Sequence, residues 1–134
     1  MNPKFLLAIL TSFFFAFLLT GCQSEDEMLM DDVSDIKEIS ISKSTDYNKL
    51  NDDFFATFQN SKELDIWKRA LNTAKREKVE VEGVNYDLLV DGYLLQLYLG
   101  EEGEKSAFFF IGHEEKVYFT SEETTQELRK IINP

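Results

Sequence analysis

The feature that most constrains this chain is a charge-free apolar run at its N-terminus. Phe5 to Leu19 carries no charged side chain; Lys4 precedes the run, and acidic sequence follows Cys22. A positively charged start, an apolar run of about 7–15 residues and a small-residue cleavage site are typical of a secretory signal peptide. A membrane-spanning helix needs about 20 apolar residues. The run therefore predicts a signal peptide over residues 1–21, and the globular part must fold without it.

The residues that close this run are Leu19, Thr20, Gly21 and Cys22. They resemble a bacterial lipobox, in which an aliphatic residue, a small residue and Gly, Ala or Ser precede a cysteine. A thiol is the nucleophile that can form a thioether to diacylglycerol, and two acyl chains hold a protein stably at a bilayer. The alternative is a buried free cysteine at the end of an apolar helix. We predict S-diacylglycerol on Cys22, with N-acylation (palmitate, for example) as a further option.

A lipid on Cys22 places the protein at the cell membrane, on the extracytoplasmic side. Gln23 follows the cysteine, so no aspartate retention signal is present, and the outer membrane stays open in an organism that has one. Cys22 is the single cysteine, which excludes a disulfide within the chain. Removal of the signal peptide with Lys4 takes the net charge from −11 to −12. Such a charge argues against nucleic acid as a partner and leaves the lipid anchor as the contact with the membrane.

Beyond the anchor, the pattern predicts an acidic flexible tether over residues 22–34 and a single domain over 35–134. Helical spacing of Leu64, Trp67 and Leu71 predicts a helix over 62–78. A second helix follows Thr120, which has capping-box spacing with Glu123.

Strands are predicted by alternating or short apolar segments bounded by turn residues. They are expected over residues 36–44, 54–58, 86–90, 93–99, 106–111 and 117–120, with a polar loop over 44–53. Asp91-Gly92 predicts a two-residue hairpin, so the later strands form a meander. The fold class is α+β: an antiparallel sheet of about five to six strands with a C-terminal meander, and two helices, one mid-chain and one C-terminal.

This order of lipobox, acidic tether, strand, helix, meander and terminal helix resembles the small YhfM-like lipoproteins of Bacillus-type bacteria. Hydrophobic spacing over residues 35–132 carries the resemblance, together with Trp67, Tyr86 and Asp87. It implies a Gram-positive membrane lipoprotein that faces the cell wall. The resemblance implies a domain of undefined function, and it identifies no catalytic residues.

Residues with catalytic or metal-binding chemistry are few. His113 is the single histidine, beside Glu114 and Glu115 in an expected turn, whereas a zinc site takes three or four ligands. A serine nucleophile in a GxSxG motif is missing, and paired carboxylates are expected in the turns of so acidic a chain. Residues 46–53 lack the glycine and terminal glutamate of a calcium-binding EF-hand loop. We therefore expect no catalytic, cofactor-binding or metal-binding residue, and no enzyme activity.

The aromatic side chains of the expected meander are the remaining candidates for a site. Tyr93, Tyr98 and Phe109 would form an interaction face if the helices leave one sheet face open; packing in the core is the alternative. The sequence thus favours a non-enzymatic binding module of the cell envelope, with an envelope protein as partner. The alternative is a lipoprotein that binds a small ligand or cation in a pocket under the 44–53 loop. The pattern leaves the oligomeric state open.

The lipid anchor is tested by Cys22→Ala. Because Cys22 is the single thiol that can be acylated, the variant is expected to lose all incorporation of labelled palmitate. Ser24→Ala, just outside the motif, serves as the control and should stay labelled. Labelled Cys22→Ala protein would contradict the prediction.

Overall fold

The computed structural model describes residues 27–81 and 83–132. The signal peptide predicted over residues 1–21 and the predicted lipobox residues 19–22 lie outside these ranges. Within them, none of the helices has the length and apolar character needed to cross a membrane.

Seven antiparallel strands form one sheet in the order β2-β1-β4-β5-β6-β7-β3. Their bounds are β1 Ile39–Lys43, β2 Ala56–Phe58, β3 Lys75–Glu77, β4 Tyr86–Val90, β5 Tyr93–Tyr98, β6 Ala107–Phe110 and β7 Val117–Phe119. The α+β class and the C-terminal meander of β4 to β7 are confirmed, with one strand more than expected. The predicted hairpin between β4 and β5 is also present, because Asp91 and Gly92 adopt the positive φ angles of 45° and 88° that such a turn needs.

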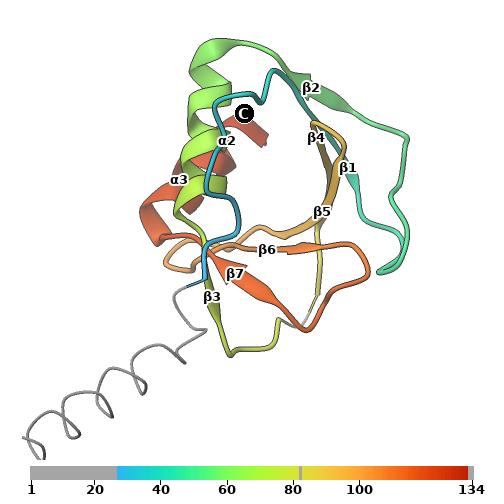
Figure 1. Ribbon diagram of the computed structural model, residues 1–134, viewed down its shortest axis with the longest axis vertical. Coiled ribbons are helices and arrows are strands. Elements are labelled where there is room, and N and C mark those ends of the chain that lie inside the picture. Colours follow the sequence, from blue (N-terminus) through green and yellow to red (C-terminus); the bar gives the residue numbers. More distant parts are fainter. Residues whose placement is uncertain (1–26, 82, 133–134) are drawn as a thin grey trace, which may run out of the picture.

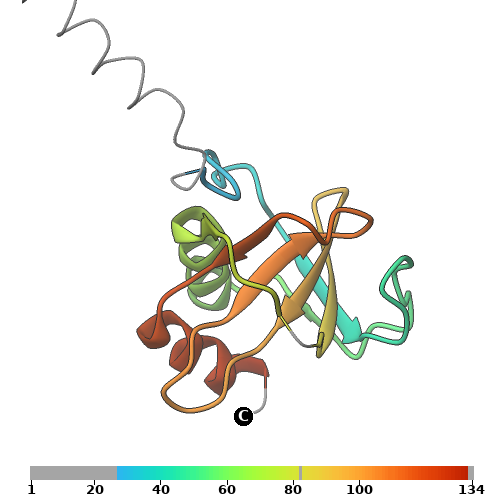
Figure 2. The same ribbon diagram turned by 90° about the horizontal axis from the view of Figure 1, so that it is seen from below.

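Two helices, α2 (Ser61–Thr73) and α3 (Glu122–Ile132), lie side by side against one face of the sheet (Figures 1 and 2). We call this the helix face and the opposite side the outer face. The helices bury Trp67, Leu71 and Leu128 against it. The strands meet them with alternate side chains, which is how a strand sends every second residue to one face: Ile39, Ile41, Leu88, Val90, Leu95, Leu97, Phe108 and Tyr118.

The mid-chain helix ends earlier than the predicted residue 78. Ala74 is fully buried and has extended backbone angles, φ −68° and ψ 128°, so the helix stops after Thr73. The next three residues, Lys75–Glu77, pair with β7 as the extra strand. Lys75, Arg76 and Lys78, which fall inside the predicted helix, therefore lie beyond the observed one. Tertiary pairing has overridden a local helical pattern here.

The cap of the C-terminal helix also differs from the prediction. The side chain of Ser121, rather than that of Thr120, accepts a hydrogen bond from the backbone N–H of Thr124 at 3.1 Å. Thr120 instead joins the sheet end, where its N–H donates to the carbonyl of Ser106 at 2.9 Å. The helix therefore begins one residue later than the capping-box spacing of Thr120 and Glu123 suggests.

The segment before the first strand is packed on the domain, in contrast to the expected tether over residues 22–34. Leu29 is 7% exposed, and its N–H donates to the carbonyl of Ala74 at 3.0 Å. Met28 forms a β-bridge with Lys75, and the N–H of Arg76 donates to the carbonyl of Glu27 at 2.8 Å. Ordered structure therefore begins at least as early as Glu27, because β3 offers this segment an edge to pair with.

Trp67 gives a direct test of the core. Its indole ring is completely buried against Phe58, and its Nε1 has no hydrogen-bond partner among the described residues. Trp67→Ala is expected to lower the free energy of unfolding by about 3–5 kcal/mol. Trp67→Phe should cost clearly less, since it keeps an aromatic ring and removes the unpaired N–H. Both variants lose the chain's single tryptophan, so its fluorescence cannot report their unfolding. Urea denaturation is therefore followed by circular dichroism. Equal losses would contradict this account.

Candidate functional site

A row of polar side chains crosses the outer face of the sheet. The strand register aligns Ser42 of β1 with Asp87 of β4, Asp87 with Gln96 of β5, and Gln96 with Phe109 of β6. All four side chains are buried. A buried polar group is costly unless it is hydrogen-bonded, so something must cover this row and supply partners.

The loop over residues 44–53 covers the row. The N–H of Asn51 donates to Asp87 Oδ2 at 2.8 Å, and Ser42 Oγ donates to the carbonyl of Asn51 at 2.6 Å. Gln96 Nε2 donates to Asp87 Oδ1 at 3.0 Å and to the carbonyl of Asp46 at 2.8 Å. These bonds fix the loop against the sheet. The side chains of Asp87 and Gln96 thus lie directly under residues 46 and 51 of the loop, where the ligand pocket was expected, and the hollow that Tyr47 of the loop does line extends over Phe109 instead.

The chain between β3 and β4 covers a second part of the outer face. In the strand order, β5, β6 and β7 lie between β3 and β4. The connection must therefore pass these strands, and Figure 1 shows its residues 78–81 and 83–85 along the lower side of the molecule. Val79 and Val81 of this connection, which we call the crossing segment, face two hollows on either side of it.

The first hollow has a volume of about 580 Å³, and we call it the Phe109 hollow. Its apolar and aromatic lining residues are Tyr47 of the 44–53 loop, Val79, Val81, Phe109 and Val117. Its charged lining residues are Glu77, Lys78, Glu80, Glu114 and Glu115. Its volume falls in the range of about 300–1,000 Å³ that is common for small-molecule sites. A lining that combines apolar and charged side chains suits a ligand with an apolar part and a polar end.

The second hollow, the Tyr98 hollow, has a volume of about 640 Å³. It shares Val79, Glu80 and Val81 with the first and adds Tyr98, Glu104, Lys105, Phe119 and Glu122. The Tyr98 hydroxyl donates to Glu104 Oε1 at 3.2 Å. Burial raises the pKa of Tyr98 above its ordinary value, and the hydrogen bond to Glu104 and the charges of Glu104 and Glu101 add to the effect. The phenol therefore stays protonated and remains a donor at neutral pH.

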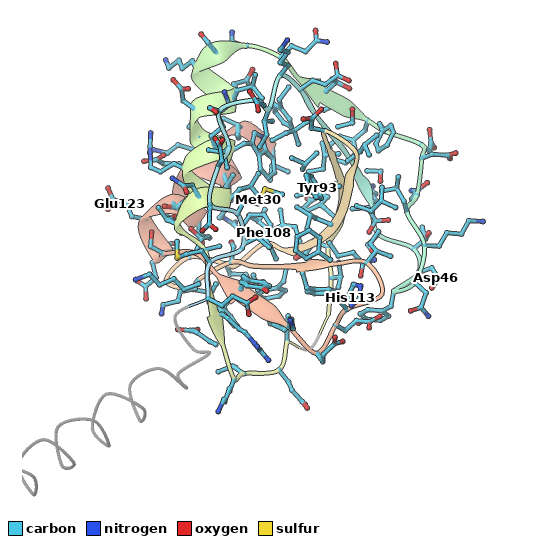
Figure 3. All side chains as sticks on the ribbon, viewed as in Figure 1. Met30, Asp46, Tyr93, Phe108, His113 and Glu123 are labelled. Carbon is cyan, nitrogen blue, oxygen red and sulfur yellow. The ribbon has the colours of Figure 1, made fainter. Side chains whose placement is uncertain are left out.

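The hairpin between β6 and β7 brings the single histidine, which lines neither hollow, close to Glu115 of the Phe109 hollow. The N–H of His113 donates to the carbonyl of Phe110 at 2.9 Å, which closes the turn. His113 Nδ1 lies 3.6 Å from Oε1 of Glu115, a residue that lines the hollow. Both side chains are about two-thirds exposed. Figure 3 places His113 on the same side of the molecule as Asp46 of the 44–53 loop.

The predicted interaction face is not a single surface. Tyr98 and Phe109 lie on the outer face, in different hollows, and Phe109 is buried. Tyr93 belongs to the helix face, since it stands five residues from Tyr98 on the same strand, and its ring is 56% exposed beside Phe110 at 6.2 Å. Strand alternation therefore separates Tyr93 from the other two aromatic side chains.

Metal-binding geometry is not found among residues 27–81 and 83–132: no group of three or more His, Cys, Asp or Glu side chains converges there. In the 44–53 loop, Asp46 accepts a hydrogen bond from the N–H of Asn48, and Asn51 accepts one from the N–H of Asp53. These polar side chains stabilise the turns of the loop.

Comparison with known proteins gives one informative similarity. No family model matches the chain, and no curated protein matches it. A crystal structure of a thioesterase-like protein from Clostridium sporogenes is similar, with a TM-score of 0.62 and 20% sequence identity. The match covers 78% of this chain and 98% of that one. At this identity the likeness shows a shared fold.

This similarity corrects two expectations from the sequence. The chain was expected to be a non-enzymatic binding module, or alternatively a small-ligand or cation-binding lipoprotein, and to have no enzyme activity. The finding contradicts both, because the chain has the fold of a protein described as thioesterase-like. The resemblance to YhfM-like lipoproteins stays a prediction.

Asp87 gives a test of how the loop over residues 44–53 is held against the outer face. Asp87→Ala is expected to lower the free energy of unfolding by about 1–3 kcal/mol, because it removes the acceptor of the Asn51 N–H and one of the acceptors of the Gln96 amide. Amide hydrogen exchange in residues 46–51 should rise with it. Asp52→Ala removes an exposed carboxylate from the same loop and serves as the control. Equal effects of the two variants would contradict the role given to Asp87.

Proposed function

We propose that this protein is a hydrolase of acyl thioesters, with the Phe109 hollow as the site for the acyl part. The observation that carries the proposal is the position of Glu115, which lines an apolar hollow and lies 3.6 Å from His113. The similarity in fold to a thioesterase-like protein supports the same class of reaction. The proposal concerns the described domain and is independent of the predicted anchor.

Phe109, Val117 and the two valines of the crossing segment give the hollow an apolar surface that favours an acyl chain. The charged side chains of the hollow stay in water, and a polar group of the ligand that entered the apolar part would lose its own hydration. The thioester carbonyl would therefore sit at the rim, at the level of Glu115, with the thiol half outside the hollow.

A carboxylate at this position can act as a general base. Glu115 would take a proton from a water molecule, whose oxygen attacks the thioester carbonyl carbon. The carbon–sulfur bond then breaks, the acyl group leaves as a carboxylic acid, and the thiolate takes up the proton from Glu115. His113 would act as a positioning residue, because its ring lies beside the Glu115 carboxylate.

The test is hydrolysis of the octanoyl thioester of N-acetylcysteamine by the purified full-length protein. Thiol release is followed with a thiol-reactive dye. Removing a general base typically lowers the rate by about 10²–10⁴-fold, so Glu115→Gln is expected to lower kcat by at least about a hundredfold, with little change in KM. Its fold should be intact, since the side chain is mainly exposed.

Glu102→Gln is the matched control. Glu102 is an exposed glutamate of the turn between β5 and β6 and lines neither hollow. The Glu102→Gln variant loses one negative charge, as Glu115→Gln does, and should hydrolyse the thioester at the full rate. A wild-type protein that releases no thiol above the buffer rate would overturn the proposed function. Full activity in Glu115→Gln would overturn the assignment of the base.

A further inference from the structure

The charges around the two hollows are strongly unbalanced. The Phe109 hollow is lined by the carboxylates of Glu77, Glu80, Glu114 and Glu115 and by the ammonium group of Lys78. The Tyr98 hollow adds two further carboxylates and Lys105. Lys105 Nζ lies 3.5 Å from Glu77 Oε1, so its charge is already used against a carboxylate of the first hollow. The described residues around both hollows therefore carry a clear excess of negative charge.

The chain as a whole has the same sign, with a net charge of −11. Such a field attracts cations to the site and repels anions, and it acts on the rate of encounter as well as on affinity. Coenzyme A, a thiol with several phosphate charges, is repelled by this rim. A cationic thiol is attracted.

The arrangement of the hollows gives the cationic part a place. Both hollows border the crossing segment and share Glu80. An acyl chain in the Phe109 hollow would leave its thiol half outside that hollow, and a peptide that continues past the shared residue Glu80 would meet the Tyr98 hollow, which Glu104 and Glu122 line. Tyr47, 52% exposed at the first hollow, offers an aromatic face to a lysine or arginine side chain.

We infer that the thiol half of the substrate is a basic peptide, so that the protein removes an acyl group from a cysteine flanked by lysine or arginine. This inference rests on the proposed thioester hydrolysis. It adds the class of the leaving thiol, which the acidic surface selects by charge complementarity.

The experiment compares matched thioesters on the full-length protein. Two S-octanoyl cysteine hexapeptides differ only in their flanking residues, lysine in one and glutamate in the other, and octanoyl-coenzyme A is the third substrate. At low ionic strength, kcat/KM for the lysine peptide is expected to exceed both others by at least about tenfold. The difference should shrink at 0.5 M salt, since the Debye length falls from about 30 Å at 0.01 M to a few ångströms near 1 M.

A charge reversal tests whether the carboxylates around the hollows cause the preference for the lysine peptide. Glu80→Lys, in the segment shared by both hollows, is expected to reduce the preference for the lysine peptide severalfold, chiefly through KM. Glu102→Lys, with the same change of charge in a turn that lines neither hollow, should keep most of the preference.

The outcomes separate the two claims. If octanoyl-coenzyme A or the glutamate peptide is hydrolysed as fast as the lysine peptide at low salt, this inference is overturned and the proposed function stands. If equal loss of preference follows from Glu80→Lys and Glu102→Lys, selection by the rim is overturned. If no thioester is hydrolysed, the proposed function fails and this inference fails with it.

Discussion

Burial of the Asp87 carboxyl group on the outer face is the constraint on which the candidate site depends. A polar group in this position destabilises the fold unless hydrogen bonds replace its water. Here the N–H of Asn51 and the amide of Gln96 replace it, at 2.8 and 3.0 Å. Gln96 also holds the carbonyl of Asp46, directly before Tyr47. One side of the Phe109 hollow is therefore positioned by a polar cluster that lies outside the hollow itself.

The other side of the hollow depends on where α2 ends. Because the helix stops at Thr73, the next residues reach the free edge of β7 and form β3 there. The chain must then return to β4 across the intervening strands. This return places Val79 and Val81 over the outer face, and it creates two hollows in place of one open apolar surface. An early helix end thus determines the shape of the site.

Much of this fold could be predicted from local patterns. Trp67 and Leu71 mark a helix, and Asp91-Gly92 marks a hairpin, because the physical cause of each lies within a few residues. β3 could not be predicted, since its three residues Lys75–Glu77 are polar and show no strand alternation. They become a strand only through pairing with Val117–Phe119 of β7. The same limit applies to the cluster at Asp87, whose partners lie 36 residues away at Asn51 and across the hairpin at Gln96.

The candidate site was missed for a chemical reason as well. A search of the sequence for a nucleophilic serine or a set of metal ligands finds motifs because those groups must act together at fixed spacings. Hydrolysis by a carboxylate and water needs only one side chain at the edge of an apolar surface, and one glutamate among 25 acidic residues has no such signature. What distinguishes Glu115 is its surroundings: Phe109 and Val117 line the same hollow, and His113 lies beside it. His113 and Glu115 are visible as neighbours in the sequence, but the apolar surface beneath them is assembled by the crossing segment and the strand register.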